Sequence, residues 1–264
     1  MLFLYLVISF GFSWILWVPE ALVVNNVSSN FFIIFLSKLS NFGAWGPFLA
    51  AIVVSLKKSR KDGLKKLFKQ TFSMSFDKKW YIPTFLLFPL IIGLPLLLLR
   101  VFGLQVPISE ALNNPFVLPI AFLVILFNAG PLQEEYGWRG IMQLELQKKY
   151  SALISSLLVG IVWGIWHLPL FFMPDKGFYY DKPIWGLILS TTLISVLFGW
   201  IYNNTNRNLL LMLLFHASYN FSHYVFPSLE SETSSMIYML SLISLVAIVI
   251  FKNGLKLSRT KTDL

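Results

Sequence analysis

The chain has 264 residues, of which 56% are hydrophobic and only 12% are charged, whereas soluble domains carry about 25% charged residues. This composition excludes an ordinary soluble globular protein, and the absence of cysteine excludes disulfides, thiolate metal sites and a cysteine nucleophile. The net charge of +9 does not indicate nucleic-acid binding, because nine of the 21 lysines and arginines lie between Lys57 and Lys79, beside an apolar segment. We expect a basic loop there that sets the topology and contacts anionic membrane lipid.

Apolar segments of membrane-spanning length follow one another along the chain. We place them near residues 2–24, 31–56, 81–102, 116–134, 152–173, 184–202, 208–226 and 235–251. Turn-forming residues separate them, and the polar stretch from Gln133 continues the fourth span without a break. The sequence therefore predicts an all-α polytopic membrane protein, a bundle of about eight transmembrane helices. It forms a single domain over residues 1–264, with a catalytic core at about 116–225.

The distribution of basic residues predicts the orientation of this bundle. With the N-terminus inside, 17 of the 21 lysines and arginines fall in inner segments, including those from Lys252 to Lys261. Because such residues are retained on the cytoplasmic side, we expect a multi-pass protein of the cell membrane with both termini cytoplasmic.

Several polar residues lie at depths where charge is costly, by about 2.5 to 3.5 kcal/mol each. Arg139 lies four residues after Glu135 and can pair with it. If the chain turns at Tyr150-Ser151, antiparallel packing brings two other groups to one depth. These two groups are Glu134 and His167.

Small residues accompany both of these groups. Glu134 shares a helix face with Gly137, and His167 shares one with Gly160 and Gly164. Small residues at this spacing allow close helix packing in membranes. We therefore expect the two faces to pack together and to press the carboxylate against the imidazole.

These groups suit peptide-bond hydrolysis without a covalent nucleophile. A carboxylate beside a histidine can hold a water and take its proton, which assigns Glu134 and His167 as the water-activating pair. His216 and Asn220 share a face of the seventh span and supply neutral donors for an oxyanion. We expect His223 to reach the outer headgroups instead of the site.

A metal-assisted mechanism is the alternative for this chemistry. Glu134, His167 and His216 could hold zinc, with one ligand from each of three helices. We favour metal-independent water activation with no cofactor and no metal ligands. The reason is that Asn220 beside His216 suits oxyanion donation better than support of a zinc ligand.

Three motifs on successive spans resemble the CPBP family, also called the Abi family, which comprises the CAAX prenyl-protein endopeptidases and bacteriocin-processing or immunity proteins. They are Glu134-Glu135-x-x-x-Arg139, Trp163-x-x-x-His167 and His216-x-x-x-Asn220. The stretches 43–47 and 198–202 resemble further family patterns, so that the resemblance covers about residues 40–225. It implies a bundle of about eight helices, endoproteolysis near the cytoplasmic face and the residue roles given above. The family usually has Phe where this chain has Trp163, and we expect that exchange only to reshape the pocket wall.

The function that we expect is intramembrane endoproteolysis of a peptide or protein substrate. A prenylated C-terminal peptide, a bacteriocin leader and a pheromone precursor all remain open as substrates. A catalytically silent scaffold or immunity protein is the alternative, in which Glu135 and Arg139 form an interfacial ion pair and His216 with Asn220 a polar clasp between helices. The joint presence of six polar positions counts against it. A small-solute transporter is disfavoured because no inverted repeat is evident.

Overall fold

The computed structural model describes residues 1–258, and within this range every regular element is a helix. Six described helices are long and apolar enough to cross a membrane, and a seventh candidate consists of two helices bent by 59°. Another helix, α10 (Leu209–Val225), has 17 residues and occupies the remaining predicted span. The all-α, multi-pass fold with about eight spans is thus confirmed. Residues 259–264, part of the predicted cytoplasmic C-terminus, lie outside the described residues.

The outer surface of the helices is apolar. Phe3, Phe116 and Phe251 are 80%, 90% and 91% exposed. Large apolar side chains are normally removed from water, whereas hydrocarbon solvates them without penalty. The exposed surface therefore fits a lipid environment.

The chain packs as two compact units. Unit 1 combines Met1–Lys69 with Gln133–Val196, and unit 2 combines Gln70–Leu132 with the chain from Leu197 onward. The expectation of a single domain over 1–264 stays a prediction.

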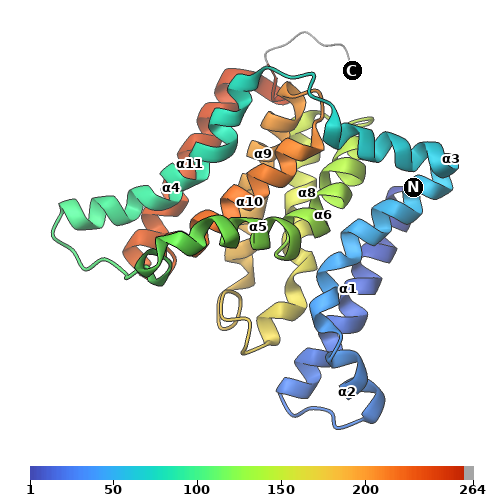
Figure 1. The fold of residues 1–264 in the computed structure, drawn as a ribbon, viewed down its shortest axis with the longest axis horizontal. Coiled ribbons are helices and arrows are strands. Elements are labelled where there is room, and N and C mark those ends of the chain that lie inside the picture. The colour runs from blue at the N-terminus through green and yellow to red at the C-terminus, as the bar shows by residue number, and fades with distance from the viewer. Residues whose placement is uncertain (259–264) are drawn as a thin grey trace. The chain divides into compact units, whose positions relative to one another are not determined.

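Unit 1 begins with a long helix and a broken one. Its first elements are α1 (Leu2–Val24), α2 (Phe31–Ser37), η1 (Ser40–Trp45) and α3 (Gly46–Phe72). The span predicted over 31–56 is present as a bent helix pair, because η1 separates α2 from α3. Side chains of α1 bind the backbone there: Ser13 Oγ donates to the carbonyl of Gly43 at 2.7 Å, and Trp17 Nε1 donates to that of Ser40 at 3.0 Å. α1 consequently packs beside α2 and η1 (Figure 1).

The basic stretch that follows is helical, which corrects the predicted loop. α3 continues to Phe72, with a break at Ser59 and Arg60, where Arg60 has φ +48°. Lysines on this part, such as Lys65 and Lys66, are exposed. The apolar and basic parts are thus two helices joined by a kink at Ser59 and Arg60.

The remainder of unit 1 forms the predicted hairpin. α6 (Pro131–Gly137) continues into the π-helical turn η5 (Trp138–Gln143) and α7 (Leu144–Leu146). The chain then turns, and Ser151 caps α8 (Ala152–Trp166) by accepting a hydrogen bond from Ile154 N. η6 (Leu168–Phe172) and the first part of α9 (Ile184–Asn204) complete the unit.

The fourth span is interrupted, contrary to prediction. α5 (Leu118–Asn128) ends before Ala129, and Gly130 has φ +106° before Pro131 starts α6. Proline lacks an amide hydrogen and glycine tolerates positive φ, so the helical ladder stops at this point. Glu134 therefore lies in the first turn of a new helix.

The predicted packing of the small-residue faces is also wrong. A Cβ on Gly160 would lie 2.4 Å from the Cα of Thr192, and one on Gly164 would lie 2.8 Å from the Cα of Ile188, so this face of α8 packs on α9. A Cβ on Gly137 would lie 2.5 Å from Tyr5 Oη on α1. Each glycine does allow close approach, but to a different helix from the one predicted.

Unit 2 is built around α10. Its other elements are η2 (Lys78–Trp80), α4 (Tyr81–Val101), η3 (Glu110–Asn113), η4 (Pro115–Val117), α5, the end of α9, α11 (Glu232–Asn253) and η7 (Gly254–Lys256). α4 runs beside α11 (Figure 1) and also packs against α10, where the Phe88 and Phe215 rings are 4.4 Å apart. Asn208 caps α10 by accepting from Leu211 N at 2.9 Å.

Candidate active site

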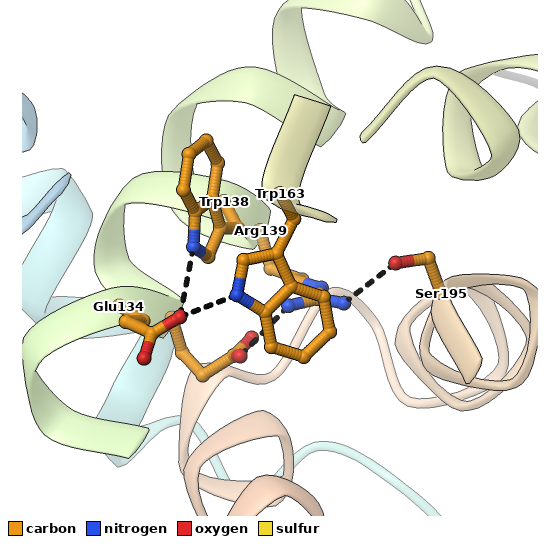
Figure 2. A network of polar contacts seen from close by, with 6 residues as sticks. Glu134, Trp138, Arg139, Trp163 and Ser195 are labelled. Atoms are coloured by element: carbon orange, nitrogen blue, oxygen red, sulfur yellow. Dashed lines mark hydrogen bonds and ion pairs between the residues drawn. The ribbon is translucent and has the colours of Figure 1, made fainter. Parts of the chain in front are cut away.

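The carboxylate of Glu134 is buried and held by two tryptophans. Its Oε2 accepts a hydrogen bond from Trp138 Nε1 at 3.1 Å and one from Trp163 Nε1 at 2.5 Å (Figure 2). The side chain of Glu134 is only 5% exposed. Hydrogen bonds to an ionised group are stronger than neutral ones, so the two indoles fix the orientation of this carboxylate.

Glu135 and Arg139 form the predicted ion pair. Arg139 Nη1 lies 2.7 Å from Glu135 Oε1, and the two side chains are 1% and 0% exposed respectively. Arg139 Nη2 also donates to Ser195 Oγ of α9 at 3.1 Å (Figure 2), and its guanidinium lies 4.8 Å from the centre of the Trp163 ring. The pair is thus a buried part of the fold, which contradicts the alternative of an exposed interfacial pair.

The π-helical turn gives this segment its geometry. All six residues of η5 are buried, including Trp138 and Arg139. In a π-helix each turn holds an additional residue, which shifts the direction of the side chains, and such turns are frequent at functional sites. Trp138 and Arg139 each contact the residue four positions earlier, Glu134 and Glu135 respectively.

His167 lies at the C-terminal end of α8, one turn beyond Trp163. Its Nδ1 is 2.8 Å from the carbonyl oxygen of Trp163, and the side chain is buried. Because a carbonyl only accepts, Nδ1 carries the proton and Nε2 is the acceptor of the neutral ring. Tyr179 stacks on the imidazole at 5.4 Å between ring centres. Trp163 therefore contacts both predicted members of the water-activating pair.

This role of Trp163 corrects the expectation that it only reshapes a pocket wall. A phenylalanine has no hydrogen-bond donor, whereas the indole here donates to Glu134.

Unit 2 carries the second predicted pair, on α10. His216 is buried, and its ring lies edge-on to that of Phe198 at 5.9 Å. Asn220 is half-buried, and its Nδ2 donates to the carbonyl of Ala129 at 2.7 Å. That carbonyl belongs to the interruption after α5, where helical partners are lacking. One amide hydrogen of Asn220 thus connects α10 to the end of α5. The convergence of His216 and Asn220 with Glu134 and His167 stays a prediction.

His223 packs against aromatic rings, and its expected contact with the outer headgroups stays a prediction. Its ring lies edge-on to Tyr219 at 4.8 Å and to Tyr238 of α11 at 5.4 Å. His223 therefore belongs to the aromatic packing between α10 and α11.

Within residues 1–258, no group of three or more His, Asp or Glu side chains is arranged to hold a metal ion. Of the three residues that could in principle hold zinc, Glu134 and His167 lie in unit 1 and His216 lies in unit 2.

Sequence reasoning missed three contributors to the site: Trp138, Ser195 and Tyr179. The first had a usable signal, since Trp138 is four residues after Glu134 on a helix. Ser195 is one of many hydroxyl residues in its span, and Tyr179 lies in a connecting segment. Nothing in their sequence context distinguishes either residue.

Comparison with known proteins identifies the family of this chain. The family model described as Type II CAAX prenyl endopeptidase Rce1-like matches residues 116–222. The CAAX prenyl protease 2 of Methanococcus maripaludis is 30% identical over 226 residues, which are 81% of this chain and 80% of that protein. The chain belongs to the CPBP family. The resemblance noted from the motifs is therefore confirmed.

Membership of the CPBP family places the chain among CAAX-type membrane proteases. The range matched by the family model contains all six predicted site residues, from Glu134 to Asn220. The buried carboxylate and ion pair of unit 1 and the His216 helix of unit 2 thus lie in the part of the chain that the family model matches.

Proposed function

We propose that this protein is an intramembrane endopeptidase in which Glu134 and His167 activate water and His216 and Asn220 stabilise the oxyanion. The observation that supports the proposal most strongly is the Glu134 carboxylate, buried and fixed by two indole donors. A carboxylate at such depth is retained only where a fold has a use for it.

The chemical steps follow from these groups. A water bound by Glu134 and the acceptor Nε2 of His167 loses a proton to the carboxylate, and its oxygen attacks the carbonyl carbon of the scissile bond. The remaining amide hydrogen of Asn220 and a ring N–H of His216 donate to the developing oxyanion. The carbon–nitrogen bond then breaks as the stored proton passes to the departing amine.

Arg139 and Glu135 position this machinery instead of taking part in the chemistry. Arg139 ties α6 and η5 to α9 through Ser195 and lies over the indole that holds Glu134. Because the pair is completely buried, it holds this segment in one arrangement.

The substrate that we propose is a peptide or protein held at the membrane. The names of the matched family and of the Methanococcus maripaludis relative both contain CAAX prenyl, so a farnesylated CAAX peptide is the first probe. Bacteriocin leaders and pheromone precursors are the other candidate substrates.

Cleavage is proposed to occur near the cytoplasmic face, with both termini on that side. The support is the excess of Lys and Arg in alternate connections. Since the chain has no cysteine, single substitutions at exposed Lys65 and Lys182 provide unique labelling sites. An impermeant thiol reagent added to intact cells should label Lys182→Cys and spare Lys65→Cys, and the reverse pattern would invert the orientation.

Comparative peptidomics tests the catalytic proposal. Cells with the wild type are compared with cells carrying Glu134→Gln, in which an amide oxygen can still accept from both indoles while the base is lost. The matched control is Glu145→Gln, a carboxylate of the same segment that pairs with Lys58 and Lys148 near the surface.

We expect peptides that accumulate as products in the wild type and the control to be missing in Glu134→Gln. The purified variant should cleave about 10²–10⁴-fold more slowly than the wild type. Wild-type cleavage by Glu134→Gln would exclude this residue as the base. Identical peptidomes, with farnesylated CAAX peptide left intact by the wild type, would favour a silent scaffold.

A further inference from the structure

Unit 2 contains a cavity of about 840 Å³ that the proposed catalytic residues do not line. Its walls come from the segment before α4, the end of α9 and the last turns of α11. This volume lies within the range of about 300–1,000 Å³ typical of ligand sites. Among the described residues that line it, Asp77 is the one acidic residue and none is a histidine, so the lining lacks the carboxylate–histidine pair proposed for the active site.

The cavity lies at one end of three candidate spans. The span of α4 starts at Lys78, that of α9 stops at Asn204, and the span of α11 continues to Lys256. Trp80 and Trp200 line the cavity with ring centres 4.9 Å apart. Tryptophan is typical of the membrane–water interface. The site is therefore at the depth where lipid headgroups meet the hydrocarbon.

One wall of the cavity is apolar. It consists of Leu245, Ile248 and Val249 on α11, of which Ile248 is 49% exposed. This wall runs along the helix from the charged end of the cavity towards the membrane-spanning part. A hydrocarbon chain laid along it would bury the exposed side chain.

The opposite end is polar and carries a net positive charge. Lys79 and Lys252 line it together with a single carboxylate, that of Asp77, which lies 2.8 Å from Lys79 Nζ. Lys252 belongs to the last turn of α11, where a cation is also favoured by the helix dipole. A bound anion could thus form an ionic contact with Lys252 and a second one with Lys79, which also contacts Asp77.

Hydrogen bonds between backbone and side chains keep these walls in place. Asn208 Nδ2 donates to the carbonyl of Ser73 at 2.5 Å, and Asn206 donates to that of Ser75, which together hold the segment before η2. Asn204 Nδ2 donates to Leu257 O at 2.8 Å and so ties the chain after α11 to α9. These contacts within the protein therefore form the cavity without a ligand.

From these features we propose that the cavity binds an anionic phospholipid, with its phosphate at Lys252 and Lys79 and an acyl chain along Leu245 and Ile248. A lipid supplies both a phosphate for the two lysines and an acyl chain for the apolar wall, whereas a soluble anion would contact only the polar end. The site is separate from the exposed basic lysines of α3, which attract anionic membranes only by charge.

Photo-crosslinking of the full-length protein in phosphatidylcholine nanodiscs tests this assignment. A small fraction of diazirine-bearing phosphatidylglycerol, or of phosphatidylcholine with the same chains, is added, and the labelled peptides are mapped by mass spectrometry. We expect phosphatidylglycerol to label residues 74–80, 200–206 and 245–253, and to exceed phosphatidylcholine there. Equal labelling by the two lipids, or labelling restricted to residues 57–69, would overturn the proposal.

Removing a positive or a negative charge from the cavity should change its labelling by phosphatidylglycerol in opposite directions. Lys252→Gln should reduce cavity labelling by phosphatidylglycerol about fivefold, the effect of one lysine near an anionic lipid. Asp77→Asn should increase it, while the amide oxygen still accepts from Lys79 N as the carboxylate does at 3.0 Å. The matched control, Lys65→Gln with Lys66→Gln, should leave cavity labelling unchanged. Unchanged labelling in both cavity variants would refute the assignment.

Two further measurements separate a lipid from other ligands. Inorganic phosphate should not displace the label, and displacement would indicate a soluble-anion site instead. Ile248→Trp, which fills the apolar wall, should reduce labelling without changing the melting curve of the protein. Retention of full labelling in this variant would exclude the acyl-chain position.

Discussion

Replacement of Arg139 by methionine removes the positive half of a completely buried ion pair. The partner Glu135 is 0% exposed and lies 2.7 Å from the guanidinium, so its charge would remain in a low-dielectric environment. Breaking such a pair from one side costs about 3 to 5 kcal/mol. Loss of the hydrogen bond to Ser195 at 3.1 Å removes about 1 kcal/mol more. We therefore expect Arg139→Met to lower the free energy of unfolding by about 4 kcal/mol or more.

A double-mutant cycle isolates the pair from the other contacts. Glu135→Gln with Arg139→Met removes both charges of this pair, so it should be more stable than Arg139→Met alone by about 2 kcal/mol or more. Unfolding is followed in mixed micelles with increasing sodium dodecyl sulfate, and cleavage is measured on the folded fraction. If Arg139→Met were as stable as the wild type, or if the double variant regained no stability, the ion pair would not have the structural role given to it here.

Four further predictions concern neighbouring features. Trp163→Phe should lower kcat about tenfold with little change in KM, because one hydrogen bond to the Glu134 carboxylate is lost; steady-state kinetics with unchanged kcat would refute this. Gly160→Leu should prevent folding, since even a Cβ would lie 2.4 Å from Thr192 Cα, and normal abundance on a membrane immunoblot would contradict that packing. Asn220→Ala should reduce kcat about 10²–10³-fold, whereas a residue that serves only as a clasp would lower abundance and leave the kcat of the folded protein unchanged. Dialysis against a chelator should leave activity intact, and loss of activity that zinc restores would establish a metal-dependent enzyme.

The sequence predicted the spans because the apolar segments are long and the turns between them polar. It also predicted the Glu135–Arg139 pair, since a separation of four residues determines which side chains meet on a helix. Both inferences depend on local geometry. They needed no knowledge of how the helices pack.

Features set by packing were beyond the sequence. The glycines at 160 and 164 indicated close approach but not the partner, which is α9. The indole hydrogen of Trp163 could have found many acceptors, and only the folded hairpin selects Glu134. The break at Gly130 was overlooked because the hydropathy of the segment remains high across it.

The two indoles on Glu134 determine where a proton can reside. A carboxylate oxygen has two lone pairs, and Oε2 already accepts from both Trp138 and Trp163. An indole nitrogen only donates, so neither tryptophan can relay a proton or exchange its role with the carboxylate. In the proposed mechanism, a proton that Glu134 takes from water must therefore go to Oε1. The two oxygens of this carboxylate would then have different roles: Oε2 accepts the two indole hydrogen bonds, and Oε1 receives the proton.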